Sequence, residues 1–180
     1  MTAIESLRTR LKGYDINQYD YDPLLDHVEN RGVFLSSRIN HFIGEYVEEV
    51  IPEWDPDPQA QHLGVGKKTD WENSKIVVEQ KKNPKTDNAS SRKSNLIKLK
   101  ESALEKGKIP IYAYWEDRKK NDYLKDDVRH LHGKAIFKYL GVENEWENFL
   151  SHLEDVKMII KQELVEKFNE HYKSSIDPTI

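Results

Sequence analysis

Three ionisable side chains near the middle of the chain would form a hydrolytic site if their segment folds as a β-hairpin. Asp70 is followed by a polar stretch with turn-forming residues, 72–75, and then by the β-branched run that opens 76–81. Side chains alternate along a strand, so Glu79 and Lys81 share one face. A turn between the two segments brings Asp70 beside that strand. Two carboxylates and one ammonium are therefore expected to converge at one end of a small sheet.

Such a cluster suits metal-assisted hydrolysis of a phosphodiester. Carboxylate oxygens are hard ligands for Mg²⁺, which keeps several waters and takes only one or two carboxylates from a protein. A bound divalent ion lowers the pKa of its water and clamps phosphoryl oxygens. A neighbouring lysine orients or helps to deprotonate the attacking water and stabilises developing negative charge. The predicted metal ligands are Asp70 and Glu79, and Lys81 is predicted to position or activate the water.

The order of these residues resembles the PD-(D/E)XK nuclease superfamily, because Asp70 is followed, after eight intervening residues, by Glu79-Gln80-Lys81. Thr69 stands where that superfamily usually has a proline. The continuation over 81–91, KKNPKTDNASS, resembles small type II restriction endonucleases that cut short interrupted sites of the GCNGC and GGNCC kind. In those enzymes an acidic-x-Lys strand runs into an Asn/Thr/Ser-rich segment and then a helix. The resemblance covers roughly residues 34–142.

The resemblance implies an activity, cofactors and partners. The activity is Mg²⁺-dependent hydrolysis of double-stranded DNA at a short palindromic site, with Mn²⁺ as a substitute ion. The backbone carbonyl of Gln80 is implied as a further ligand, and Glu45 is our choice for an additional carboxylate on the helix before the sheet. A two-fold site is most simply served by a homodimer. A cognate DNA methyltransferase that protects host DNA is implied as a system partner.

Two alternatives to this interpretation remain open. One is a structure-specific nuclease on the same fold, a junction resolvase or repair nickase, which would cleave branched or mismatched DNA and spare intact duplex. The other is a DNA-binding or protein-interaction module without enzymatic activity, in which Asp70, Glu79 and Lys81 form a surface ion-pair cluster. Metal dependence separates them, because a surface salt bridge has no need of Mg²⁺.

Local charge indicates where a DNA backbone would lie. The net charge of −4 does not favour a nonspecific polyanion binder, but residues 81–100 carry seven basic side chains and one acid, whereas residues 143–170 carry eight acids and three lysines. Helix N-termini with hydroxyls and cations bind phosphate, and Asn and Arg read base edges. The predicted DNA-contacting residues are Lys82, Lys85, Asn88, Ser90, Ser91, Arg92, Lys93, Asn95, Arg129 and His130. His130 and His132 alone do not make a zinc site.

Periodicity and turn residues predict the elements that position these side chains. The first half is expected to hold a helix over 2–12, a helix from Pro23 interrupted at Gly32, and an amphipathic helix that follows Ser36-Ser37 and is closed by Pro52. The loop over 52–64 contains only a weak strand candidate.

The second half is expected to alternate helices and strands. The first helix is capped by Asn88 or Ser90 and ends at Gly107, and its packing residues are Leu96, Ile97, Leu99, Ala103 and Leu104. It is followed by a strand over 109–115, a charged loop over 116–125 and a strand over 128–132. The chain then forms a helix from Gly133 to Gly141 and a long helix or helix pair over 145–173.

The expected fold is therefore α/β, a small mixed β-sheet flanked by helices with a helical C-terminal part. A single restriction-endonuclease-like domain is expected over 1–180, with N-terminal helices 1–51, a catalytic sheet core 52–142 and a helical part 143–180. No cysteine is present, which excludes disulfides and thiolate metal sites. No run approaches the ~20 apolar residues of a membrane span and no signal peptide is recognisable, so we expect a cytoplasmic protein with no membrane partner.

Overall fold

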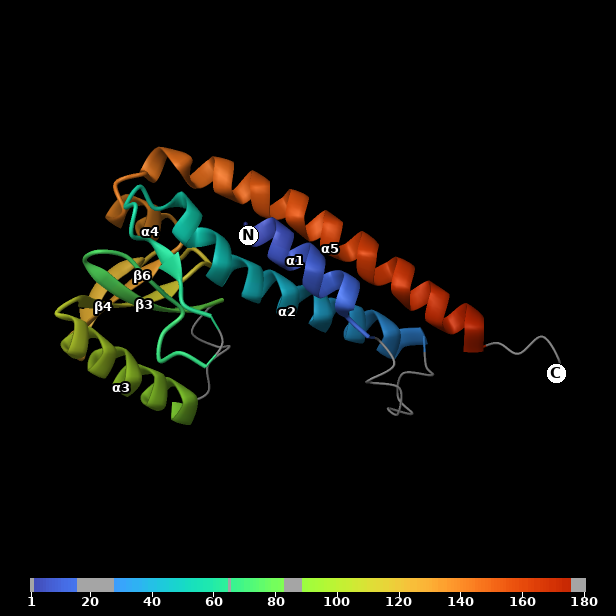
Figure 1. Cartoon of the computed structure of the whole chain (residues 1–180), viewed down its shortest axis with the longest axis horizontal. Helices are drawn as coiled ribbons and strands as arrows, with labels where there is room; N and C mark the ends of the chain where they lie inside the picture. Colours follow the sequence, from blue (N-terminus) through green and yellow to red (C-terminus); the bar gives the residue numbers. More distant parts are fainter. Residues whose placement is uncertain (1, 16–27, 65, 83–88, 176–180) are drawn as a thin grey trace. The chain divides into compact units, whose positions relative to one another are not determined.

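The fold is mixed α/β, as predicted. The computed structural model describes residues 2–15, 28–64, 66–82 and 89–175 (Figure 1). The chain divides into two compact units, Met1–Tyr46 with Leu150–Ile180, called the helical unit, and Val47–Phe149, called the sheet unit. The sheet unit contains the six-stranded sheet and all three residues of the predicted catalytic cluster.

The elements follow one another in a mostly alternating order. The helices are α1 (Ala3–Gly13), α2 (Val28–Trp54), α3 (Ala89–Lys106), α4 (Lys134–Tyr139), the 3-10 turn η3 (Glu143–Glu145) and α5 (Trp146–Ser175). The strands are β1 (Gln61–His62), β2 (Trp71–Glu72), β3 (Ile76–Lys81), β4 (Ile109–Tyr114), β5 (Asp122–Lys125) and β6 (Val128–His132).

The sheet has the strand order β1-β2-β3-β4-β6-β5. The three central strands β3, β4 and β6 are parallel, and the outer neighbours pair antiparallel. The connection from β3 to β4 runs through α3, as a parallel pair requires a crossover. Ligands of open α/β sheets bind at the carboxyl ends of parallel strands. In this sheet that edge holds Lys81, Tyr114 and His132, the last residues of β3, β4 and β6.

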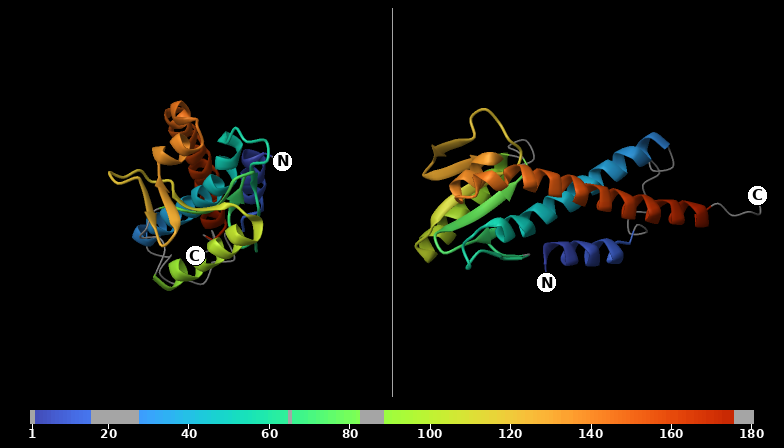
Figure 2. Two further views of the ribbon diagram at one scale, coloured as in Figure 1. Left: turned by 90° about the vertical axis from the view of Figure 1, so that its left-hand side faces the viewer. Right: turned by 90° about the horizontal axis from the view of Figure 1, so that it is seen from above.

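Helix α3 covers one face of the sheet, while α4 lies on the other side (Figures 1 and 2). The α3 side contains a buried apolar cluster made of Val77, Leu99, Ala103, Tyr112, Tyr114 and Val128. Two members come from the helix and the other four from β3, β4 and β6. This packing fixes α3 against the central strands, and it places the start of the helix at the carboxyl edge of β3.

Helix α2 differs from the prediction at both ends. It runs unbroken through Gly32 and continues past Pro52 to Trp54. A glycine inside a helix costs only about 1 kcal/mol, and the buried stripe of a 27-residue helix offsets it; the stripe consists of Phe42, Ile43, Tyr46, Val47, Val50 and Ile51. Pro52 lies in the last turn, where it removes one intrahelical hydrogen bond, and the helix ends two residues later.

Other sequence predictions need smaller corrections. Ser90 lies inside α3, which begins at Ala89, so it does not cap the helix. Leu104 was expected to pack but is 85% exposed. The charged segment 116–125 contains the edge strand β5, whose exposed side chains lack the apolar alternation of a half-buried strand. Asn88, Lys85 and the segment from Pro23 to residue 27 lie outside the described residues.

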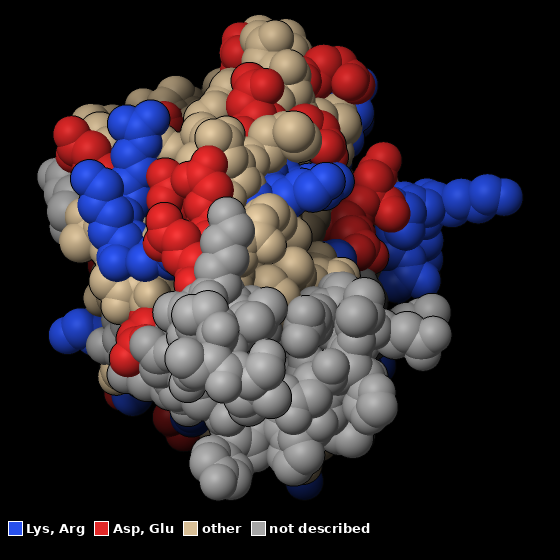
Figure 3. All heavy atoms as spheres, turned by 90° about the vertical axis from the view of Figure 1, so that its right-hand side faces the viewer, with Lys and Arg blue, Asp and Glu red and all other residues tan. Residues whose placement is uncertain are grey.

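The helical unit is held together by apolar packing and ion pairs. Leu7 and Leu11 of α1 are buried, as are Val156, Ile160 and Leu164 of α5. On the face shown in Figure 3, Lys and Arg side chains lie beside Asp and Glu side chains, so that surface does not carry one sign of charge. No helix in the described part of the chain combines the length and apolar character that crossing a membrane requires.

Candidate active site

The β2–β3 hairpin forms as predicted and brings the two halves of the motif together. Trp71 pairs with Val78 and Glu72 with Val77. The turn is closed by Asn73, whose side-chain oxygen accepts hydrogen bonds from the backbone N–H groups of Lys75 and Ile76 at 2.8 and 2.9 Å. Asparagine favours such turns because its side chain replaces a backbone acceptor.

Asp70 lies where the hairpin ladder opens. Its backbone N–H donates to the carbonyl of Val78 at 3.0 Å, and its own carbonyl accepts from the N–H of Leu63 at 2.9 Å. Its carboxylate Oδ2 accepts the backbone N–H of Gln80 at 2.6 Å. The carboxylate thus accepts a backbone hydrogen bond that a carbonyl of the neighbouring strand would otherwise accept. This bond fixes the carboxylate against β3.

The carboxylates of Asp70 and Glu79 converge on the ammonium of Lys81. The Nζ atom of Lys81 lies 2.7 Å from Oε1 of Glu79 and 3.5 Å from Oδ2 of Asp70. The side chains are largely buried, with 8% of Glu79, 20% of Asp70 and 24% of Lys81 exposed. The sequence prediction that these three groups meet at the end of a strand is confirmed.

The carboxylates keep Lys81 protonated. Burial by itself lowers the pKa of this lysine, but the negative charges of Asp70 and Glu79, the hydrogen bond to Glu79 and the charge of Glu48 together raise it above its ordinary value. Lys81 is therefore an ammonium at neutral pH. In this state it can orient an anion or a water and stabilise negative charge, but it cannot accept a proton.

The helix preceding the sheet contributes Glu48 to this electrostatic environment. Glu48 belongs to the sheet unit and interacts with Lys81 through its charge. Glu45, the carboxylate that the sequence suggests, instead pairs with Arg10 at 3.4 Å inside the helical unit, and a ring nitrogen of His41 lies 3.4 Å from its other oxygen. Glu45, Glu48 and Glu49 all lie beside the apolar stripe of this helix. The sequence alone does not show which of them lies near Lys81, whereas the fold does.

The donor chemistry of the cluster fits a small hard cation. Two carboxylate oxygens already face one positive charge, the ammonium of Lys81. Mg²⁺ needs only one or two protein carboxylates and completes its shell with water. Among the described residues, no three His, Asp or Glu side chains gather as a metal-binding group. The protein donors available at this point are thus Asp70 and Glu79, and a role for the Gln80 carbonyl stays a prediction.

The predicted DNA-contacting residues of α3 begin at the same edge of the sheet. Ser90, Ser91 and Lys93 are exposed, while Arg92 and Asn95 are half-buried. Arg92 lies close enough to His130 of β6 for its charge to help lower the pKa of that histidine. Lys82 lies 3.7 Å from Glu116 and within 5.6 Å of the Trp115 ring centre.

The DNA contact of Arg129 and His130 stays a prediction, and the structure puts these two side chains on opposite faces of the sheet. Strand alternation puts Arg129 on the sheet face opposite Glu79 and Lys81, where it pairs with Asp122 at 2.8 and 2.7 Å. His130 is only 4% exposed. We therefore leave both residues out of the proposed DNA surface.

His130 instead belongs to a stack of rings on the same sheet face as the carboxylates. Its ring lies 4.9 Å from that of Tyr123 and 5.6 Å from that of Tyr112, and the rings of His132 and Tyr114 are 4.4 Å apart. Burial lowers the pKa of both histidines to about 4. The histidines are accordingly neutral at pH 7, and this part of the face adds no charge to the site.

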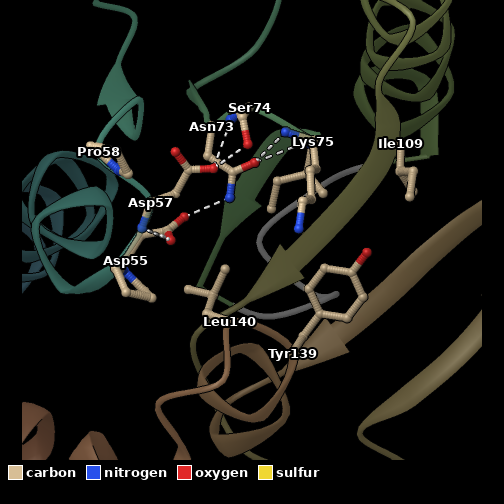
Figure 4. Close-up of a pocket in the computed structure, with 11 residues that line it drawn as sticks. Asp55, Asp57, Pro58, Asn73, Ser74, Lys75, Ile109, Tyr139 and Leu140 are labelled. Atoms are coloured by element: carbon tan, nitrogen blue, oxygen red, sulfur yellow. Dashed lines mark hydrogen bonds between the residues drawn. The ribbon is translucent and has the colours of Figure 1, made fainter.

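A pocket of about 550 Å³ lies at the opposite end of β3, around the hairpin turn (Figure 4). Two carboxylates of its wall are engaged in the turn: Asp55 accepts from the side chain of Asn73 at 2.7 Å, and Asp57 accepts from the backbone N–H of Ser74 at 3.1 Å. Lys75 and Tyr139 also line the pocket.

The ion cluster at the carboxyl end of β3 is therefore the candidate active site. It combines two carboxylates, a protonated lysine and a nearby helix N-terminus with exposed hydroxyls and a cation. Comparison of the chain with protein-family models, with curated proteins and with solved structures found no match.

Proposed function

We propose that the protein is a type II site-specific deoxyribonuclease that cleaves both strands of a short palindromic DNA site with Mg²⁺. The observation that carries the proposal is the convergence of Asp70, Glu79 and Lys81, largely buried, at the carboxyl end of a parallel strand. The proposal includes a two-fold dimer and a companion methyltransferase, both of which rest on the sequence resemblance.

The roles follow from the geometry and charge of each group. Asp70 and Glu79 would hold the metal ion, which supplies an activated water and neutralises the phosphoryl oxygens when bound. Lys81, kept protonated by its neighbours, orients the scissile phosphate or the water and stabilises negative charge as the phosphorus–oxygen bond breaks. Glu48 adds negative charge that favours cations at this point.

The burial of the cluster distinguishes it from an ordinary surface ion pair. Exposed pairs form among long, mobile side chains and contribute at most about 1 kcal/mol. Glu79 is 8% exposed, and burying such charges is costly even when they are paired. Charged groups held together in this way are common at functional sites. This supports an active site over a solvated charge cluster.

The test is cleavage of duplex DNA of known sequence by the purified protein with Mg²⁺, followed by sequencing of the ends. We expect discrete cuts at one short site. Asp70→Asn, Glu79→Gln and Lys81→Met should each lower the rate by about 100-fold or more, equivalent to roughly 2.7 kcal/mol of transition-state stabilisation.

Lys106→Met is the matched control. Lys106 pairs with Glu72 on the same sheet face but at the turn end of the hairpin, so its removal should leave cleavage unchanged. Rates within about tenfold of the parent for any two of the three site variants would contradict the assignment. Cleavage of branched DNA alone would point to a structure-specific nuclease, and full activity in excess chelator would eliminate the metal mechanism.

A further inference from the structure

A buried hydrogen bond lies directly behind the candidate site. The indole Nε1–H of Trp71 donates to the side-chain Oε1 of Gln80 at 3.0 Å. Trp71 is 1% exposed and Gln80 is fully buried. Each residue is the chain neighbour of site residues: Trp71 follows Asp70, and Gln80 separates Glu79 from Lys81.

This pair occupies the face of the sheet opposite to the carboxylates. Side chains alternate along β3, so Gln80 points away from the face of Glu79 and Lys81. Trp71 pairs with Val78, which puts it on the Gln80 face as well. The hydrogen bond therefore joins β2 to β3 from behind, at the level where the catalytic groups meet in front.

The hairpin has few other connections at this level. The β2–β3 ladder includes Trp71 and Glu72 and stops before Asp70. Beyond it, the two strands are joined by the backbone bond from Asp70 to Val78 and by the bond from the N–H of Gln80 to the Asp70 carboxylate. Both of these involve Asp70 itself. The Trp71–Gln80 bond adds a connection between two uncharged side chains that does not involve Asp70.

The side-chain nitrogen of Gln80 does not explain why a glutamine is buried here. Within the described part of the chain, its Nε2 has no hydrogen-bond partner, although it is shielded from solvent. A leucine or methionine would remove this unsatisfied amide donor, but it would leave the buried indole N–H of Trp71 without its acceptor. A buried glutamine at this point is therefore explained by its oxygen, which accepts the indole N–H.

We propose that Trp71 and Gln80 are positioning residues that hold the Asp70 carboxylate against Glu79 and Lys81. The inference rests on the proposed function for its catalytic consequence, but not for its effect on cation binding. Without the bond, the open end of the hairpin can separate, and the two carboxylates no longer face one point. Partners that orient metal ligands from behind typically change metal affinity by about 10- to 100-fold.

The experiment compares Trp71→Phe, Gln80→Met and the double variant with the parent. We expect each single variant to weaken Mn²⁺ binding, read by electron paramagnetic resonance, by about tenfold. Their kcat should fall by roughly 10- to 100-fold, with KM for the cognate duplex within about threefold of the parent. Tyr46→Phe is the control, because it removes a partly buried hydrogen bond, Tyr46 to His152 at 2.6 Å, within the helical unit.

The double variant separates positioning from simple stabilisation. It replaces both polar partners by apolar groups, so that neither the indole donor nor the amide acceptor is left buried and unpaired. We expect its Tm to return toward the parent while kcat and Mn²⁺ affinity stay low. Recovery of kcat together with Tm, or single variants that bind Mn²⁺ as tightly as the parent, would overturn the inference.

The outcome for the parent distinguishes this inference from the proposed function. A parent that binds Mn²⁺ but cleaves no DNA would reject the nuclease, and the Mn²⁺ affinities of the variants would still decide the role of the pair. A parent that neither binds Mn²⁺ nor cleaves DNA would reject both.

Discussion

The ammonium of Lys81 serves two carboxylates, so its charge matters to the fold as well as to the chemistry. Its Nζ lies 2.7 Å from Glu79 and 3.5 Å from Asp70, and Glu79 is nearly inaccessible to water. A buried carboxylate without a counterion is costly. Any change that removes this ammonium should therefore destabilise the hairpin, and a divalent cation should be able to replace part of its effect.

Lys81→Met is the corresponding prediction. We expect the free energy of unfolding to fall by about 3 kcal/mol, because two carboxylates lose their counterion. Added Mg²⁺ should raise the Tm of this variant more than that of the parent, since binding to the folded state stabilises it by mass action. Urea unfolding with and without Mg²⁺ checks both points. Lys106→Met is the control, since Lys108 still pairs with Glu72; equal losses in the two variants would contradict the prediction.

The positions of site residues could be predicted from the sequence only where residues close together in the chain determine them. Strand alternation and one turn were enough to predict that Asp70, Glu79 and Lys81 meet, because all three lie within one hairpin. Glu48 could not be chosen over Glu45, because which side of α2 faces β3 depends on packing between elements distant in the chain. The burial of His130 depends likewise on α3 and β5, which its own strand does not reveal.

At the scale of the elements, the turn between β6 and α4 leaves no room for a side chain at Gly133. Gly133 has a φ of +49°, and a Cβ at this position would lie 2.6 Å from the Cβ and 2.7 Å from the Cα of Asp117. Its N–H donates to the carbonyl of Tyr114 at 2.8 Å. Only glycine fits here, and the contact fixes the loop after β4 at the carboxyl edge of the sheet.

Gly133→Ala should therefore destabilise the protein by about 3 kcal/mol, the sum of backbone strain and overlap with Asp117. Gly141→Ala is the matched control: its φ is +80°, but no atom lies within 4 Å of the added Cβ. Strain alone should cost about 1 kcal/mol there. Urea unfolding of both variants measures the loss in the free energy of unfolding. Similar losses would show that Asp117 moves away from the added Cβ with no free-energy penalty.

The ring stack on β4, β5 and β6 makes stability depend on pH. Burial lowers the pKa of His130 and His132 to about 4, against an ordinary value of 6.5. Nearby charges contribute less: Lys125, Asp126 and Arg92 act on His130, and Arg118 and Asp117 act on His132. The unfolded chain therefore binds more protons than the folded chain between these values. The stabilisation is complete above about pH 6.5 and declines as the pH falls toward 4.

We expect the free energy of unfolding to drop by roughly 2 kcal/mol for each histidine between pH 7 and pH 5. The double variant His130→Phe, His132→Phe keeps the aromatic stack and should lose most of this slope. His41→Gln, which removes an exposed histidine of α2, should keep it. Denaturant unfolding at several pH values measures the slopes, and an unchanged slope in the double phenylalanine variant would show that these histidines are protonated when folded.

The elements themselves were predictable where packing and local propensity agree. The β2–β3 hairpin, β4, β6 and α5 follow from β-branched runs or long apolar periodicity. The sequence predicts helix ends at Gly32 and Pro52, but the burial of α2 outweighs a single unfavourable residue. Strand β5 was missed because an edge strand pairs through its backbone, and its side chains remain exposed.

For the whole molecule, the distribution of charge predicts how DNA would bind. The basic segment 81–100 begins at the last residue of β3, whereas the acidic segment 143–170 lies mostly in α5. Contacts to phosphate set affinity and its salt dependence, while contacts to bases set specificity. Arg92, half-buried in the first turn of α3, is our candidate for a base contact. Arg92→Ala should cost ~1–3 kcal/mol on the cognate duplex and nothing on a scrambled one.

Lys93 is the candidate for a phosphate contact, since it is exposed in the same turn. Lys93→Ala should weaken binding to cognate and scrambled duplexes alike and reduce the slope of log affinity against log salt by about one unit. Lys161→Ala, which removes an exposed lysine from the acidic segment of α5, is the matched control and should leave the slope unchanged. Binding is measured in Ca²⁺ across a salt series, so that turnover does not interfere. If Lys93→Ala keeps the parent slope as Lys161→Ala does, the start of α3 does not contact the phosphate backbone, and the charged loop from Glu116 to Asn121 is the next segment to test.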